Sequence, residues 1–267
     1  GMGGFTTAYT SSMNGSYGQS VNFNNPATYG SIYLTTFDLG ININSNTLKR
    51  TNPVGREKSN YMSPNYLAIG VPINKVKKIG MAFGLRPISQ INYSINEISY
   101  LTKTGDSILN NYKGDGGLNQ VFFGVGKTWK NISLGFNTGV NFGRKNIETR
   151  KSFLYNTDST HYYQSLSSTN TIYSGLFLNM GIQGEFAIKT VIGKIPSDKI
   201  EYSISYGATY NLDQRLNGKQ DILRSTGVFT STSDSPIDTV SLQSNLGGTI
   251  KVPGVYSFGI ALHKKEI

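Results

Sequence analysis

From Ser31 onward, apolar residues recur at every second position through most of the chain, and this alternation limits the possible folds more than any other feature. The stretch Phe37-Asp-Leu-Gly-Ile-Asn-Ile-Asn44 is a clear example. A period of two places successive side chains on opposite faces of a β-strand. The pattern predicts eight strands, with alternating positions at 37–43, 67–73, 79–95, 121–125, 132–142, 172–186, 200–210 and 256–262.

The connections between these strands alternate in length. Long polar connections are expected near 45–63, 97–117, 148–168 and 214–253, and short ones near 74–78, 127–131 and 190–198. The strands are long, and their polar positions hold Gly, Asn and Ser rather than charged residues. These features predict an all-β fold, an antiparallel up-and-down transmembrane β-barrel. A soluble β-sandwich or small soluble barrel, with the apolar positions in a packed core, gives the same periodicity and is the competing interpretation.

Composition excludes several other classes of protein. No run approaches the roughly 20 apolar residues of a membrane-spanning helix. Cysteine is absent and there are two histidines, so disulfides, thiol catalysis and a His-built metal site are not expected, nor is any cofactor. The net charge is +10, but the basic residues lie mostly in short turns such as 75–78, so no nucleic-acid partner is expected.

The chain carries no complete enzyme motif. Gly124-Val-Gly-Lys-Thr128 looks like the end of a phosphate-binding loop, but Val121 stands where the first glycine is required and no helix is predicted to follow. There is no Gly-x-Ser-x-Gly elbow, and neither histidine belongs to a recognisable triad. We therefore expect no enzymatic activity, no catalytic residue and no metal site.

The first thirty residues form a separate zone, rich in Gly, Ser, Thr and Asn and without alternation, which predicts a loop or flexible arm. The order of Met2-Gly-Gly4, polar arm, Asn25-Pro26-Ala27 and first strand resembles that of the FadL-like outer-membrane transport family. The stretch Ile250–Leu262, with its Pro-Gly pair, is similar to the entry into a later strand of that family.

The resemblance implies a 14-stranded barrel of which about eight strands are present. Residues 1–30 would then be an N-terminal hatch containing Asn25, Pro26 and Ala27. Residues 31–267 would be a barrel that is incomplete at its C-terminus.

The polar side of each strand is expected to face the barrel lumen, where it would hydrogen-bond the hatch. A buried arginine there needs a partner. Glu185 and Glu201 occupy polar positions of the alternation on adjacent predicted strands, so they are the candidates for Arg86. The predicted lumen-facing residues are Asp38, Asn42, Arg86, Asn137, Asn141, Asn179, Gln183, Glu185 and Glu201.

Two functions are compatible with such a barrel in the cell outer membrane. The resemblance implies uptake of small hydrophobic compounds through a hatch-plugged barrel. The alternative is a structural or secretion-accessory barrel whose long extracellular loops bind a protein partner. The expected partners are outer-membrane lipid and either a hydrophobic small-molecule ligand or a protein, with the Lys-rich short turns at the periplasmic end.

Overall fold

The computed structural model describes residues 6–9, 20–51, 54–100, 107–154, 163–192, 199–229 and 234–266. They form one antiparallel β-sheet and one short 3-10 helix, η2 (Pro26–Ser31). The strands are β1 (Thr36–Thr51), β2 (Val54–Asn74), β3 (Ile79–Tyr100), β4 (Ser107–Trp129), β5 (Ile132–Leu154), β6 (Gln164–Ile192), β7 (Lys199–Asn211), β8 (Gln214–Phe229), β9 (Asp234–Val252) and β10 (Val255–Glu266). The all-β prediction is confirmed.

The sheet is an up-and-down meander in which neighbours in sequence are neighbours in space. The order runs from β1 to β7 and then to β10, with β8 between β6 and β9. The long strand β6 pairs with β7 along its second half and with β8 along its first half. Only residues 212–213 separate β7 from β8, and residues 253–254 separate β9 from β10. The ten strands therefore lie along eight long paths, and each predicted strand falls within one of them.

The predicted long loops are wrong, because most of their residues are in strands. Residues 97–100 and 107–117, for example, pair across β3 and β4 in continuous register. The regular alternation of apolar residues stops there, because Asn, Gly and charged residues interrupt it, yet the backbone ladder continues. Apolar periodicity detects only the part of a strand that has an apolar face.

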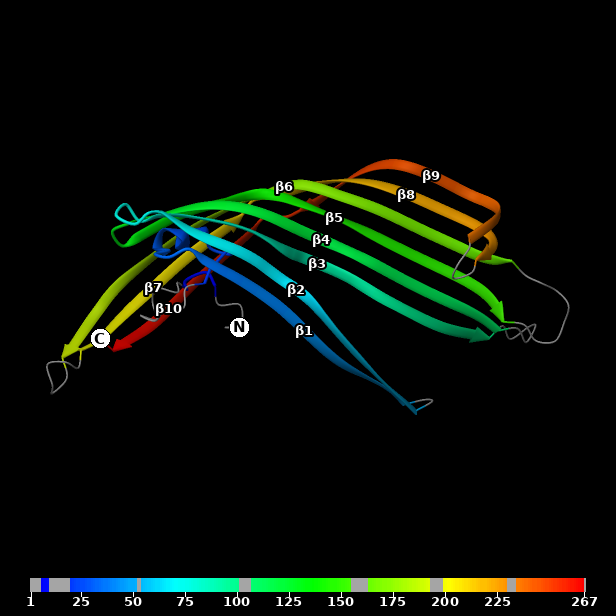
Figure 1. Cartoon of the computed structure of the whole chain (residues 1–267), viewed down its shortest axis with the longest axis horizontal. Helices are drawn as coiled ribbons and strands as arrows, with labels where there is room; N and C mark the ends of the chain where they lie inside the picture. Colours follow the sequence, from blue (N-terminus) through cyan, green and yellow to red (C-terminus); the bar gives the residue numbers. More distant parts are fainter. Residues whose placement is uncertain are drawn as a thin grey trace.

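Closure of the sheet into a barrel is not seen. Among the described residues, β1 pairs only with β2, and β10 pairs only with β7. The sheet is an open arch, and η2 lies beneath it (Figure 1). We call the side that carries η2 the concave face and the opposite side the convex face.

The two faces of the sheet differ sharply in chemistry and exposure. Apolar side chains of the convex face are exposed, for example Leu176 (74%) and Phe258 (81%), whereas Ala82 and Asn137 on the concave face are buried. The apolar positions therefore do not form the packed core that a soluble sandwich requires. No helix in the described part of the chain is long and apolar enough to cross a membrane.

The apolar part of the convex face forms a band of limited height. On β5 it runs from Ile132 to Phe142, and from Arg144 to Arg150 the same face carries charged and amide side chains. Ten residue intervals span roughly 33 Å, which at a strand tilt of about 40° gives an apolar band about 25 Å tall. We call the sheet beyond Phe142 and its cross-strand neighbours the polar extension.

The band can be tested by placing the same charge at two heights on the convex face of β5. Phe136→Arg should destabilise the protein in lipid vesicles by about 2–4 kcal/mol, the cost of a lipid-facing cation near the bilayer midplane. Ser152→Arg, in the polar extension, is the matched control and should cost less than about 1 kcal/mol. The measurement is urea-induced unfolding from vesicles, and equal losses in the two variants would disprove a lipid-facing band.

Candidate functional site

The candidate site is the contact between the N-terminal segment, residues 20–32, and the concave face of the sheet. Asn25 begins the turn of η2, because its Oδ1 accepts a hydrogen bond from the Ala27 N–H at 3.1 Å. Pro26 occupies the first helical position, where its fixed φ and missing N–H are tolerated. Asn25 also donates from Nδ2 to the carbonyl oxygen of Thr7 at 2.5 Å, which ties residues 6–9 to the turn.

The hydrophobic core of the described chain lies between this segment and the sheet. Tyr29 is completely buried, and Val21 and Ile32 are nearly so. They pack with four side chains of the concave face, Ala68, Ala82, Phe122 and Phe177. Full burial of one large apolar side chain contributes about 1.5–3 kcal/mol, so the segment is an integral part of the fold.

Four glycines form a row across the sheet beneath the segment. The register pairs Gly80 with Gly126, Gly126 with Gly135, and Gly135 with Gly181, from β3 to β6. We call these four residues the glycine row. Each of the four glycines lies on the concave side of its strand, and the strand register places them opposite one another.

The glycine row lets the backbone of the segment approach the sheet more closely than any side chain would permit. A Cβ atom added to Gly126 or Gly135 would lie 2.4 or 2.3 Å from the carbonyl oxygen of Pro26. At Gly80 it would lie 2.0 Å from the carbonyl oxygen of Tyr29. Real Cβ contacts of this length do not occur, so the turn fits only against glycine.

The same arrangement recurs on the next strand, β7, where residues 6–9 lie against the sheet. A Cβ atom at Gly207 of β7 would lie 2.0 Å from the carbonyl oxygen of Thr7. The neighbouring carbonyl oxygen of Ala8 accepts hydrogen bonds from Gln183 Nε2 at 3.3 Å and Ser205 Oγ at 2.9 Å. Glycines make room for the backbone, and polar side chains beside them satisfy its carbonyl groups.

Arg86 connects the segment to the sheet. Its Nη1 donates to Asn24 Oδ1 and its Nε donates to Gln120 Oε1, both at 2.8 Å. The guanidinium also lies 4.8 Å from the centre of the Phe23 ring, a cation–π contact. The expected pairing of Arg86 with Glu185 is not observed, because amide oxygens and an aromatic face take the place of a carboxylate. The other expected partner, the side chain of Glu201, lies outside the described part of the structure.

Amide side chains extend the Arg86 contact across the concave face. Gln120 Nε2 donates to Asn141 Oδ1 at 2.9 Å, and Asn141 Nδ2 donates to Gln214 Oε1 at 2.6 Å. A separate amide, Asn137, donates to the carbonyl oxygen of Phe23 at 2.9 Å. These bonds satisfy buried polar groups that would each cost about 1–3 kcal/mol if left unpaired.

The predicted lumen residues fall into two groups. Five of them contact residues 20–32 or 6–9 or belong to the Arg86 network: Asp38, whose Oδ2 accepts from the Val21 N–H, together with Arg86, Asn137, Asn141 and Gln183.

The other four lie away from the segment contact. Asn42 is exposed on the free part of the concave face. Asn179 donates to Asn211 Oδ1, and Glu185, although exposed, accepts from Ser203 Oγ at 2.8 Å. The side chain of Glu201 lies outside the described part of the structure.

Whether the segment acts as a hatch stays a prediction, because the described sheet does not enclose a lumen. What the structure shows is a segment bound to one face. Burial raises the pKa of the Tyr29 phenol well above its ordinary value, opposed by the Asn137 amide and the Arg86 charge. Tyr29 therefore stays neutral and acts as a packing group.

A groove of about 680 Å³ opens where β2 separates from β3. The two strands pair only between 67–74 and 79–85, after which each continues with its other neighbour alone. Its lining includes Tyr66, Leu85 and Phe142, and it is largely apolar. In the described chain no group of three or more His, Cys, Asp or Glu residues is placed to hold a metal ion.

The antiparallel meander and the different chemistry of its two faces define a class of protein. A twisted antiparallel meander with an exposed apolar band on one side and small or polar residues on the other is the architecture of outer-membrane β-barrel proteins. The BamG family model matches residues 1–267, and the chain belongs to the BamG family. Family and β-rich fold together point to a bacterial outer-membrane-associated protein. Comparisons with curated proteins and with solved structures gave no match.

The resemblance to the FadL-like transport family is therefore wrong. BamG is a family related to the Bam complex, not to FadL transporters. The two stretches that suggested the resemblance have local explanations in the structure. Asn25-Pro26 is the N-cap of a 3-10 turn, and Pro253-Gly254 is the interruption between β9 and β10. Both reflect ordinary Asn, Pro and Gly turn chemistry, and transport of hydrophobic compounds has no support from the family.

The close fit of the segment predicts a large effect from one methyl group. Gly135→Ala should force the Pro26 carbonyl away from the sheet, at a cost of about 1–3 kcal/mol typical of overpacking. With Ala27→Cys as the reporter, the rate of thiol labelling at the buried turn should rise roughly tenfold or more, since 1.4 kcal/mol is a factor of ten. The chain has no other cysteine, so labelling is specific.

Gly248→Ala is the matched control, because nothing lies within 4 Å of a Cβ atom at that position. It should leave the labelling rate at Ala27→Cys unchanged. If Gly135→Ala also leaves the rate unchanged, the segment does not depend on the glycine row.

The Arg86 contacts predict a second, independent loss of stability. Arg86→Gln removes the bonds to Asn24 and Gln120 and should lower the free energy of unfolding by about 1.5–3 kcal/mol, the usual worth of hydrogen bonds from a charged donor. Arg56→Gln, at an exposed position of β2, is the control and should change it by less than about 0.5 kcal/mol. A stabilised Arg86→Gln variant in urea unfolding would mean that burial of the charge outweighs its bonds.

Proposed function

We propose that this protein is a non-enzymatic accessory component of outer-membrane protein assembly, anchored by its apolar band and bound to a protein partner. The observation that carries the proposal is the match of the BamG family model to the whole chain. The family name implies association with the Bam complex. Of the two functions considered from the sequence, the accessory role is the one this family supports.

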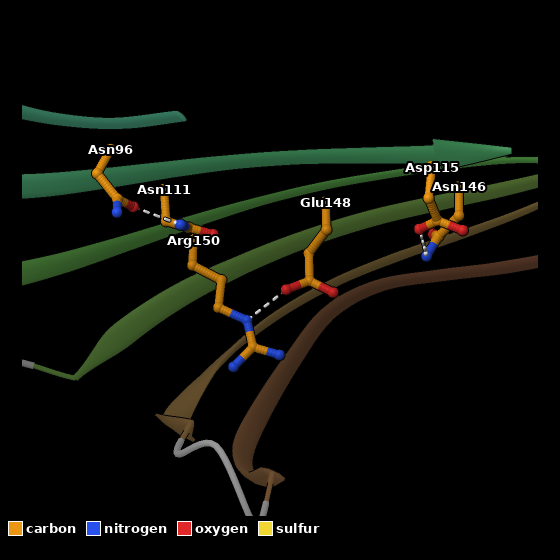
Figure 2. Close-up of polar contacts among 6 residues, drawn as sticks. All are labelled: Asn96, Asn111, Asp115, Asn146, Glu148 and Arg150. Carbon is orange, nitrogen blue, oxygen red and sulfur yellow. Dashed lines mark hydrogen bonds and ion pairs between the residues drawn. The ribbon is translucent and has the colours of Figure 1, made fainter. Parts of the chain in front are cut away.

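The polar extension supports a role in protein binding. Beyond the apolar band, β3, β4 and β5 continue with amide and charged side chains on the convex face. Asn111 Nδ2 donates to Asn96 Oδ1 at 2.5 Å, and Asn146 Nδ2 donates to Asp115 Oδ1 at 3.3 Å (Figure 2). These cross-strand contacts, with the ion pair between Arg150 and Glu148, hold side chains in fixed positions on a water-facing sheet. A rigid polar surface suits a protein contact better than capture of an apolar solute.

The groove between β2 and β3 supports the same role. It lies at the base of the polar extension and is lined largely by apolar groups. An apolar groove bordered by polar surface is a common form of protein interaction site. We propose that the groove and the adjoining polar extension together contact the partner.

The proposal predicts a specific cross-linking pattern in cells. A photo-reactive amino acid at Gln90, which lines the groove, or at Asn111, in the polar extension, should cross-link to a component of the Bam complex. The same amino acid at Lys77, in a short turn at the opposite end of the sheet, is the control and should not give that product. Mass spectrometry of the purified adduct identifies the partner.

Depletion of the protein gives the functional readout. Other outer-membrane β-barrel proteins should fall in amount while their transcripts stay constant, because the defect is in assembly. Normal levels of these proteins after depletion, together with no cross-link at either position, would exclude the assembly role.

A further inference from the structure

Four basic side chains form a cluster on the convex face at the upper boundary of the apolar band. They are Arg144 of β5, Arg215 and Lys219 of β8, and Lys251 of β9. All four are exposed, and none makes an ion pair or a hydrogen bond to another residue in the part of the chain that the structure describes. We call them the boundary cluster.

The sheet register brings the members of the cluster together. Arg144 pairs with Ile172, and Ile172 pairs with Lys219, so the two cations lie two strands apart, about 10 Å. Arg215 lies four residues from Lys219 on the same strand, about 13 Å away. The cluster therefore covers a patch of the size of a lipid headgroup and its neighbours.

The side chain of Arg215 points to the convex face because its neighbours point to the concave face. Gln214 accepts a hydrogen bond from Asn141, and Leu216 is buried beside Gly175, both on the concave side. Lys251 is directly opposite Arg215 in the register and shares its face.

Two like charges directly opposite each other destabilise an antiparallel pair, because their Cβ atoms are only about 4.5–5.5 Å apart. No carboxylate of the described chain forms an ion pair with Arg215 or Lys251. Asp213, two residues before Arg215, accepts a hydrogen bond from the Gly254 N–H. The nearby acidic residue Asp221 instead accepts a hydrogen bond from the Asn245 N–H. A bound anion would turn this repulsion into a favourable contact with both cations.

The surface beside the cluster indicates which anion. The convex face of β10 lies directly below it and exposes Tyr256 (66%), Phe258 (81%) and Ile260 (71%). The Tyr256 ring stacks on Tyr210 at a centroid distance of 4.3 Å, and such aromatic side chains are typical of membrane interfaces. An apolar wall for acyl chains with cations at its upper edge matches a lipid whose headgroup carries phosphate.

We propose that the boundary cluster binds the anionic phosphate headgroup of a membrane lipid, whose acyl chains lie along the convex face of β10 and β7. Arg144 and Lys219 mark the height of the headgroup layer, and Arg215 with Lys251 binds the phosphate from two strands. Arg144 also lines the groove proposed to contact the protein partner, whereas Arg215 and Lys251, which bind the phosphate in this proposal, do not.

The test compares two double variants of the full chain in a neutral detergent, with phosphatidylglycerol added and bound lipid counted by native mass spectrometry. Arg215→Gln/Lys251→Gln should weaken the first bound phosphatidylglycerol roughly tenfold or more, because each basic residue near a lipid surface contributes substantially to anionic lipid affinity. Lys58→Gln/Lys113→Gln removes two exposed cations far from the cluster and should leave this affinity within about twofold. Equal affinity in both double variants would overturn the proposal.

Stability gives a second readout that a merely structural role would not produce. Without anionic lipid, Arg215→Gln/Lys251→Gln should unfold at a higher temperature than the unaltered protein, because the repulsion is gone. With phosphatidylglycerol present the order should reverse, since only the unaltered protein gains from binding. No reversal would overturn the proposal.

The remaining outcomes distinguish other ligands. If inorganic phosphate produces the same reversal and displaces phosphatidylglycerol, the cluster is a small-anion site and the lipid assignment is wrong. If lipid affinity is unchanged while cross-linking to a protein partner is lost, the cluster binds an acidic protein surface instead.

Discussion

The contact between the backbone of the N-terminal segment and the glycine row is the constraint on which the rest of the concave face depends. Because Gly126 and Gly135 carry no side chain, the Pro26 carbonyl can lie against the sheet. This approach brings Tyr29 and Val21 into contact with the aromatic and small residues of the strands and forms the hydrophobic core. Without the glycine row, the N-terminal segment could not lie this close, and its carbonyl groups would be out of reach of the polar side chains on the concave face.

Close approach also creates the electrostatic problem that the amide network solves. A segment lying this near the sheet excludes water from its carbonyl groups and from Arg86. Buried charges usually need a carboxylate, but here a guanidinium is shared between amide oxygens and the Phe23 ring. Amides can donate and accept at once, so a chain such as Gln120 to Asn141 satisfies both ends. The need to satisfy these buried groups explains why many concave positions of the strands hold Asn or Gln.

The sequence predicted the fold better than it predicted the site. Alternation located all eight strand paths, because in the apolar band each strand has one apolar and one polar face. It failed in the polar extension, where Asn, Gly and charged residues interrupt the alternation in β4 between 107 and 117 although its ladder is intact. It also placed Asn137 and Asn141 on the same side of the sheet, which is the concave face in the structure, but it did not give their partners. The alternation of residues gives the face on which a side chain lies. Its hydrogen bonds depend also on the strand register and on the path of the N-terminal segment across the concave face.

The glycine row could have been found only after the strands were aligned. Gly80, Gly126, Gly135 and Gly181 are unremarkable separately in a chain with 31 glycines, and their meaning comes from being opposite one another. The family assignment had a similar limit. Asn25-Pro26 and Pro253-Gly254 were interpreted as marks of one family, but each is explained by its local turn, so neither distinguishes one barrel family from another.

Several irregularities of the sheet lie at one height, and their position bears on its shape. The register shifts at Pro87–Ser89 in β3, Gly116 and Gly117 in β4 have φ values of +129° and +157°, and the paths β7–β8 and β9–β10 are interrupted at 212–213 and 253–254.

All of these positions lie close to the upper edge of the apolar band, within a few residues of Phe142 and its cross-strand neighbours. Bulges and interruptions bend a strand and increase its twist, so the sheet arches at this level (Figure 1). Below the bend, one face carries the apolar band and the other the bound segment, and above it the convex face is mostly polar. The bend therefore lies where the convex face changes from apolar to polar, and the groove and the boundary cluster lie at that same height.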